Sequence, residues 1–293
     1  MKKMLIALFA GLLYLPASAC DICGCGTNNL NPFLFPYLSK NYIAIGYMHR
    51  SYHIFPADGM KSQEYYNTFS ITGQYSLGKK WQIVAMIPYL QSKLVAQDGT
   101  KRISGLGDIT LAVNYKLLDR QNALSRHSIV IGGGAKLATG SYRSSTSSDT
   151  DEQNFQLGTG SFDYLLSGAY RYSHKKWAFS TSASYKYTTQ NKQDYRFGDV
   201  FSASEMAVYN VKLNKFSISP YLQLVYEKQM QNADNHKLQA GSDGNIFYAG
   251  GGIDISKGRF SLGINYQAAA TQNLADHVIN AKPRLATQVS FTF

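Results

Sequence analysis

The chain has 293 residues, of which 44% are hydrophobic, 22 are Tyr and 15 are Phe, and its formal net charge is +11. This aromatic content excludes a disordered chain, and no apolar run of about 20 residues occurs beyond the first 19 positions, so the body of the chain cannot cross a membrane as helices. The basic residues are spread along the sequence without a dense cluster, which argues against a nucleic-acid partner and favours attraction to anionic lipid headgroups.

Residues 1–19 have the organisation of a cleaved secretory signal peptide. Lys2 and Lys3 provide the positive start, residues 4–15 form a short apolar core, and Ala17-Ser18-Ala19 is a small-residue cleavage site. The apolar core is too short for a transmembrane anchor. Cleavage after Ala19 removes Lys2 and Lys3, lowers the formal charge from +11 to +9, and makes Cys20 the first mature residue.

Residues 20–40 form a cysteine-rich N-terminal segment that carries all 3 cysteines, Cys20, Cys23 and Cys25. Three thiolates this close could bind Cu(I) or Zn(II), with a fourth ligand from a partner, a His or the terminal amine. Two thiols could instead form a disulfide in the oxidising periplasm, or Cys20 could be lipidated, although Ala17 stands where lipoprotein signals usually have Leu. These three interpretations stay open.

The rest of this segment, residues 26–40, is apolar and interrupted by Pro32 and Pro36. Its position directly before the first predicted strand suggests that it enters the periplasmic mouth of a barrel as a plug.

From residue 41 to the end, apolar and polar residues alternate with a period of two, which predicts β-strands. In residues 260–268, for example, Phe260, Leu262 and Ile264 share one face while Ser261 and Gly263 share the other. Each run has about 10 or more residues, the length that crosses a bilayer at a tilt. Twelve runs are predicted: 41–52, 65–78, 80–94, 105–118, 127–140, 156–173, 176–189, 199–213, 215–230, 245–256, 259–271 and 284–293.

The connections between these runs alternate between short and long. Residues 78–80, 173–176, 213–215 and 256–258 are tight turns, 119–126 is of moderate length, and the others are longer and polar. Outer-membrane barrels have short periplasmic turns, long extracellular loops and an even number of strands. We therefore predict an all-β protein, a 12-stranded antiparallel up-and-down transmembrane β-barrel over residues 41–293, in the outer membrane of a Gram-negative cell.

An aromatic residue opens the strand after each tight turn, and the closing strand ends in another. Such a level of aromatics is typical of the girdle that barrels place at a bilayer interface. The predicted girdle consists of Trp81, Trp177, Phe216, Phe260 and Phe293.

Three segments resemble elements of the outer-membrane proteins grouped as the "MetA-pathway of phenol degradation" family. Residues 104–111 are similar to its Gly-Leu-Gly-Asp strand start, 134–140 to its Lys-Leu-Pro-Thr-Gly element, with Ala138 in place of Pro, and 157–163 to its Leu-Gly-Thr-Gly-Ser-x-Asp element. The resemblance is good over residues 100–215 and implies a barrel and transport. The final residues, with Phe293 last, resemble the sorting pattern through which the assembly machinery recognises barrels.

If the apolar faces meet lipid, the alternate residues line the interior, and their charges must be paired or hydrated. They form either a structural network or a lining that selects solutes. Twelve strands lie between barrels of about eight strands, which hold only side chains or one ligand, and those of about sixteen, which leave an aqueous channel, so we predict a narrow or plugged lumen. The predicted lining is Asp108, Asn114, Lys116, Asp163, Arg171, Lys186, Glu227, Asp254 and Arg284.

These features predict a channel or transporter for a small molecule, hydrophobic or aromatic, that needs no cofactor. The alternative is a protein that handles copper or zinc through Cys20, Cys23 and Cys25. A barrel-embedded lipid hydrolase is disfavoured: Ser51 lies between His49 and His53, but no nucleophile motif surrounds it, and we expect no enzyme. The expected partners are the solute, outer-membrane lipid, lipopolysaccharide and the barrel-assembly machinery.

Overall fold

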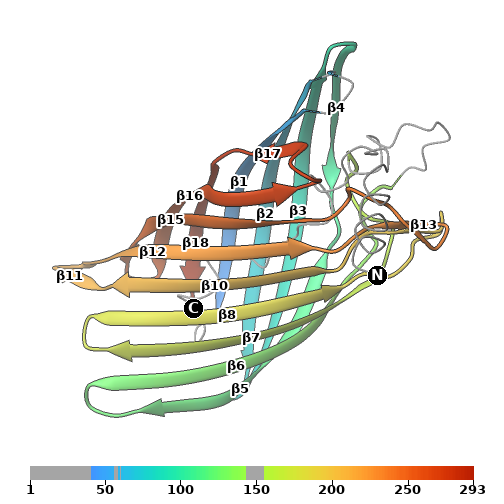
Figure 1. Cartoon of the computed structure of the whole chain (residues 1–293). Helices are drawn as coiled ribbons and strands as arrows, with labels where there is room; N and C mark the ends of the chain where they lie inside the picture. Colours follow the sequence, from blue (N-terminus) through green and yellow to red (C-terminus); the bar gives the residue numbers. More distant parts are fainter. Residues whose placement is uncertain (1–40, 56–58, 60, 143–154) are drawn as a thin grey trace, which may run out of the picture.

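The computed structural model describes residues 41–55, 59, 61–142 and 155–293. They form a closed antiparallel barrel with twelve strand positions (Figure 1). Over the described ranges, no helix is long and apolar enough to span a membrane. The barrel strands are β1 (Tyr42–Ile54), β2 (Ser62–Leu77), β3 (Trp81–Ala96), β5 (Thr110–Gln121), β6 (Ser125–Lys136), β7 (Asp163–His174), β8 (Trp177–Tyr187), β10 (Val200–Tyr209), β12 (Phe216–Gln229), β15 (Gly244–Lys257), β16 (Phe260–Leu274) and β18 (Arg284–Thr292).

Neighbours in the chain are neighbours in the barrel, and β1 closes the ring against β18. The closing register pairs Tyr42 with Thr292 and His49 with Leu285. Three shorter strands extend barrel positions: β4 (Gly99–Leu106) pairs with the upper half of β3, β11 (Val211–Leu213) continues β10 along β12, and β17 (Ile279–Ala281) precedes β18 beside β1. The predicted strand number and topology are therefore confirmed.

Several predicted boundaries need correction. The run 127–140 ends at Lys136, and Asn210 divides the run 199–213 into β10 and β11. The run 105–118 is two strands, because residues 107–109 interrupt it and β4 forms a hairpin with β3 rather than part of the next crossing. Residues 156–162 precede β7 and are not in a strand. The connection 119–126 is shorter than predicted, because β5 and β6 reach Gln121 and Ser125.

The tight turns lie at one end of the barrel and the long connections at the other (Figure 1). Gly78 and Gly258 have φ values of 68° and 61°, and Lys175 and Asn214 have 51° and 52°. Positive φ is what short hairpin turns require, because it matches the twist of the flanking strands. These turns fix which end of each strand faces which compartment, and short turns are periplasmic in outer-membrane barrels.

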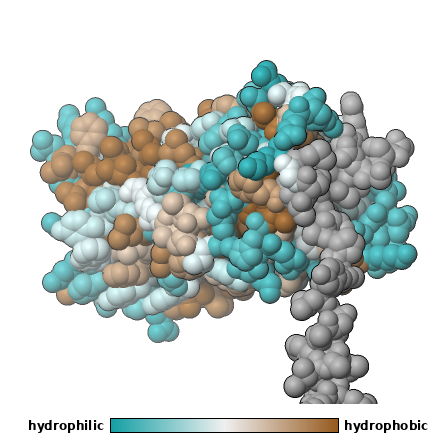
Figure 2. Space-filling model, turned by 45° about the horizontal axis from the view of Figure 1, so that its top comes forward, coloured by the Kyte–Doolittle hydropathy of each residue, from teal (hydrophilic) through white to brown (hydrophobic). Residues whose placement is uncertain are grey.

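The alternation along the strands places apolar side chains outside and polar ones inside. On β1, Ile43 and Ile45 are 53% and 63% exposed, whereas Tyr42 and Ala44 are 1% and 2% exposed. On β18, Val289 is exposed while Gln288 is buried. Figure 2 shows apolar residues gathered over the outside of the barrel. This is the reverse of the arrangement in a water-soluble protein, and it is the arrangement expected of a barrel surrounded by hydrocarbon. The chain is thus an outer-membrane β-barrel.

Replacing Leu222 with Arg should test this orientation directly. Leu222 lies near the middle of β12 and is 73% exposed, so the change would place a charge in hydrocarbon, at a cost of about 2–4 kcal/mol near the bilayer midplane. Leu238, in the short strand β14 (Lys237–Leu238), is 67% exposed and provides a matched control. We expect Leu222→Arg, but not Leu238→Arg, to lower the urea midpoint of the folded barrel in lipid vesicles. Equal midpoints for the two variants would refute the lipid-facing assignment.

A small second sheet lies on the long-loop side. It consists of β9 (Tyr195–Arg196), β13 (Ala233–Asp234) and β14, in the order β14-β13-β9. Tyr195 of β9 and the nearby Phe197 are buried together, and Asn232 donates a hydrogen bond to the Tyr195 hydroxyl (2.9 Å). This sheet ties the connection after β8 to the connection after β12.

Candidate functional site in the barrel interior

A polar network covers the inner face of four neighbouring strands, β12, β15, β16 and β18. Arg284 of β18 donates to Gln267 of β16 (2.5 Å) and to Glu227 of β12 (2.8 Å). Gln267 in turn donates to Gln223 (2.7 Å). The Arg284 guanidinium also lies 3.9 Å from the ring centroid of Tyr248 on β15. We call Gln223, Glu227, Tyr248, Gln267 and Arg284 the Arg284 network.

Two glycines of β15 make these cross-strand contacts possible. Gly250 stands in register between Gln223 and Gln267, and Gly252 stands between Tyr221 and Asn265. A Cβ at Gly252 would lie 2.5 Å from the Tyr221 hydroxyl, which receives a hydrogen bond from Asn265 (3.1 Å). Side chains of β12 and β16 therefore meet over β15, and the glycine-rich sequence of β15 leaves the space for them.

A second buried cluster lies at the loop end of β5, β6 and β7, with Lys136 at its centre. Lys136 is 0% exposed, and its ammonium contacts Asp108 (2.6 Å), Asp163 (3.1 Å) and the Thr159 hydroxyl (2.5 Å). Its fourth contact is the Ser161 carbonyl (3.0 Å). Asp108, Lys136, Thr159, Ser161 and Asp163 form what we call the Lys136 cluster.

The Lys136 cluster unites the three segments whose sequences resemble family elements. Asp108 lies in the first element, Lys136 lies in the second, and Thr159 and Asp163 lie in the third. Gly140 also donates its backbone N–H to Asp108 (2.9 Å). The three elements are thus parts of one ion-paired core that holds residues 157–162 against the barrel wall.

The other predicted lining residues occupy separate places on the inner face. Asn114 lies beside Gly132, whose Cβ would approach its side-chain oxygen to 2.2 Å. Lys116 lies 3.7 Å from Asp119 near the turn end, and Lys186 is buried on β8. Arg171 of β7 and Asp254 of β15 attract each other electrostatically, although three strands of the barrel order separate them.

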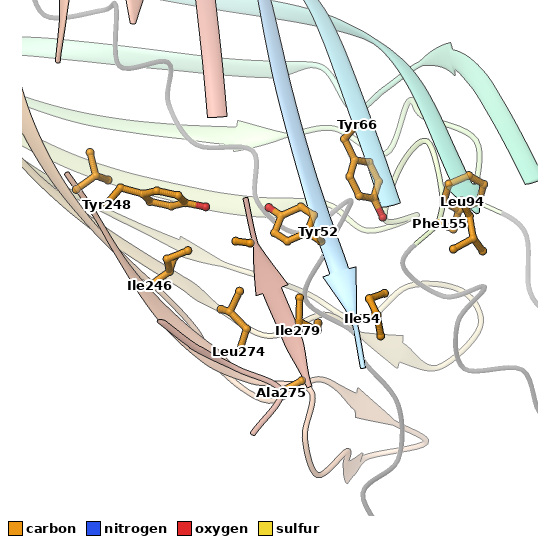
Figure 3. Close-up of a cluster of buried hydrophobic side chains, with 12 residues drawn as sticks. Tyr52, Ile54, Tyr66, Leu94, Phe155, Ile246, Tyr248, Leu274, Ala275 and Ile279 are labelled. Carbon is orange, nitrogen blue, oxygen red and sulfur yellow. The ribbon is translucent and has the colours of Figure 1, made fainter. Parts of the chain in front are cut away.

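On the side of the loop end formed by β1–β3 and β12–β17, the interior carries a cluster of buried hydrophobic residues, in which the Tyr66 hydroxyl donates to the buried Glu64 (2.6 Å). Tyr52, Tyr66 and Tyr248 pack with aliphatic residues of β1, β3, β12, β15, β16 and β17 (Figure 3). Figure 3 shows the Tyr52 and Tyr248 hydroxyls pointing toward each other. A small cavity of about 20 Å³ borders Tyr52, Glu227 and Tyr248. We call Tyr52, Tyr66 and Tyr248, with the aliphatic residues around them, the tyrosine cluster. Tyr248 also belongs to the Arg284 network, so the two groups adjoin.

The predicted girdle residues are exposed on the outer surface at the turn end. Trp81, Trp177, Phe216, Phe260 and Phe293 are between 43% and 62% exposed. Four of them pack against neighbouring rings: Trp81 on Tyr115 (4.7 Å), Trp177 on Tyr209 (4.7 Å), Phe260 on Phe291 (5.1 Å) and Phe293 on Phe291 (6.5 Å).

Two predicted features lie outside the described residues: the cysteines Cys20, Cys23 and Cys25, and the segment 26–40 that we expect to act as a plug. In the part of the chain that the structure describes, no group of three or more His, Cys, Asp and Glu side chains is arranged to hold a metal ion.

Lys136, Gln267 and Tyr248 were absent from the predicted lining, although all three are buried and in contact with residues that were in it. Strand parity could have placed each of them inside, since each shares a face with polar neighbours. A preference for charged residues explains why the neutral Gln267 and Tyr248 are absent, but not why Lys136 is, since both its charge and its parity place it among the lining residues.

Solved structures share this fold at low sequence identity. The COG4313 outer membrane channel from Pseudomonas putida F1 is 14% identical, with a TM-score of 0.66, and the match covers 87% of this chain and 96% of that one. The β domain of the Bordetella autotransporter Brka is 11% identical, with a TM-score of 0.50, and covers 87% and 100%. No curated protein matches the chain. The family described as "Putative MetA-pathway of phenol degradation" matches residues 61–276, which include all three elements of the Lys136 cluster, and the chain belongs to this family.

Proposed function

We propose that the protein is an outer-membrane channel that passes a small molecule, hydrophobic or aromatic, through a narrow polar lumen. The similar structure from Pseudomonas putida is an outer membrane channel, which supports this role. The observation that carries the proposal is the adjacency of the tyrosine cluster to the Arg284 network inside one barrel.

A solute with an apolar ring and one polar group would suit an interior in which the tyrosine cluster at the loop end is followed by the Arg284 network. At the loop end it would meet the rings of Tyr52 and Tyr248, which offer apolar area and a hydroxyl. Deeper in, Glu227, Gln267 and Arg284 offer both donors and acceptors, but these groups are already bonded to one another. They can therefore exchange partners with a passing polar group without leaving a buried charge unpaired.

Replacing both Tyr52 and Tyr248 with Ala should change solute preference in a predictable direction. An aromatic contact contributes about 1 kcal/mol, which equals about a fivefold change in binding. In proteoliposomes we expect the wild type to take up small aromatic solutes faster than sugars of equal mass, and the double variant to lose this preference. Loss of the rings should also raise single-channel conductance, because it widens the interior.

Tyr75→Ala is the matched control, since Tyr75 lies on the outer face and is 54% exposed. It should leave both conductance and preference unchanged. Reconstituted protein that passes no member of the solute panel, or that passes aromatics and sugars equally, would contradict the proposed function.

A further inference from the structure

The end of the barrel that carries the tight turns is strongly basic. The turns at residues 78–80, 175–176, 214–215 and 258–259 contain no Asp or Glu. Exposed lysines lie in them or directly beside them; we call these the turn-end lysines: Lys79, Lys80, Lys175, Lys176, Lys215 and Lys257. Asp119, near the end of β5, is acidic, but it is bonded to Arg126 through both oxygens (2.7 and 2.8 Å).

The described connections at the opposite end have mixed charge. The connection after β8 contains Asp194 and Asp199 beside Arg196, and Arg196 pairs with Asp199 (2.7 Å). The connection after β12 contains Asp234 and Lys237. The positive charge is therefore a property of one end of the molecule and not of its surface in general.

Contacts with the outer aromatic residues show which way two of these lysines face. The Lys80 ammonium lies 5.7 Å from the ring centroid of Tyr115, and the Lys257 ammonium lies 5.2 Å from that of Phe216. Phe216 is 43% exposed on the outer surface. Lysine stems that lie along outward-facing rings place their charges at the outer rim, at the level where girdle aromatics meet lipid headgroups.

We propose that the turn-end lysines bind the headgroups of acidic phospholipids in the periplasmic leaflet of the outer membrane. The turns that carry them are distributed along the chain from β2 to β16, so the charges surround the barrel and fit a ring of lipids better than a single bound molecule. Each basic side chain near an anionic membrane surface strengthens binding by about fivefold. This inference is independent of what passes through the lumen.

The test compares two variants of the full mature chain that lose the same number of positive charges at opposite ends. In one variant the turn-end lysines are all replaced by Gln. In the control the following are replaced by Gln: Lys61, Lys101, Arg102, Lys192, Lys237 and Lys282. Each protein is placed in bilayers of phosphatidylcholine with phosphatidylglycerol, and the selectivity of spin-labelled phosphatidylglycerol over phosphatidylcholine at the protein surface is measured.

We expect the wild type and the control to select phosphatidylglycerol several-fold, and the turn-end variant, which keeps Arg259, to lose most of this selectivity. High salt should abolish the selectivity of the wild type, because exposed charges are screened. A wild type without selectivity, or a turn-end variant that keeps it, would overturn the proposal. Binding of the wild type to isolated peptidoglycan sacculi without lipid selectivity would assign the same surface to an acidic cell-wall polymer instead, and would also overturn it.

Discussion

Replacing Lys136 with Met should destabilise the barrel by about 3–5 kcal/mol, the cost of removing one partner from a buried ion pair. Lys136 is 0% exposed and lies between Asp108 and Asp163, which are 2% and 0% exposed. Without the ammonium, two carboxylates would remain buried beside each other. The urea midpoint for loss of the folded, heat-modifiable species in detergent measures the change.

A second substitution separates the charge effect from lost packing. If Asp108→Asn is added to Lys136→Met, one of the two unpaired charges is removed, and we expect the midpoint to recover in part. Lys212→Met, at an exposed position of β11, should leave the midpoint near that of the wild type. A double variant no more stable than Lys136→Met alone would show that the charges are not the cause.

Replacing Gly250 with Ala should cost about 1–3 kcal/mol, the usual penalty for overpacking. The added Cβ would lie 2.1 Å from the Tyr266 carbonyl oxygen and 2.7 Å from the Gln267 Cα. Both atoms belong to the backbone of β16, so the strand itself must move and the Gln223–Gln267 hydrogen bond must lengthen or break. The same urea midpoint reports this loss.

Gly168→Ala on β7 is the control, because a Cβ there meets no atom within 4 Å. It should be neutral or slightly stabilising, since Ala restricts the unfolded chain more than Gly does. If both alanine variants unfolded at the same urea concentration, it would be wrong that Gly250 leaves the space for the contact between Gln223 and Gln267.

The sequence was sufficient to predict the barrel because the two faces of each membrane-spanning strand lie in different environments. Hydrocarbon outside and a polar interior impose a two-residue alternation, as in the exposed Leu262 and Ile264 against the buried Ser261 and Asn265 of β16. That constraint ends beyond the membrane. The β3–β4 hairpin was missed for this reason: Lys101 and Arg102 are adjacent, exposed residues of β4, and a strand that is wet on both faces has no alternating pattern.

The interior could be predicted only as a set of inward-facing positions. Parity places Asp108 and Asp163 inside, but it does not reveal that Lys136 joins them, because the partners are 28 and 27 positions apart and depend on the register of three strands. The contacts over Gly250 were equally hidden. They depend on Gln223 and Gln267 standing level on strands that are not adjacent.

The pairing of β1 with β18 has a consequence for how the protein reaches its native state. Tyr42 pairs with Thr292, so the ring can close only after nearly the whole polypeptide has been exported. Contacts between such distant parts of a chain form slowly, because a large loop must close before they give any stabilisation. Until then β1 and β18 both present unpaired edges with apolar side chains, which favour aggregation. The unpaired edges of the sheet must therefore be protected in the periplasm until β1 pairs with β18.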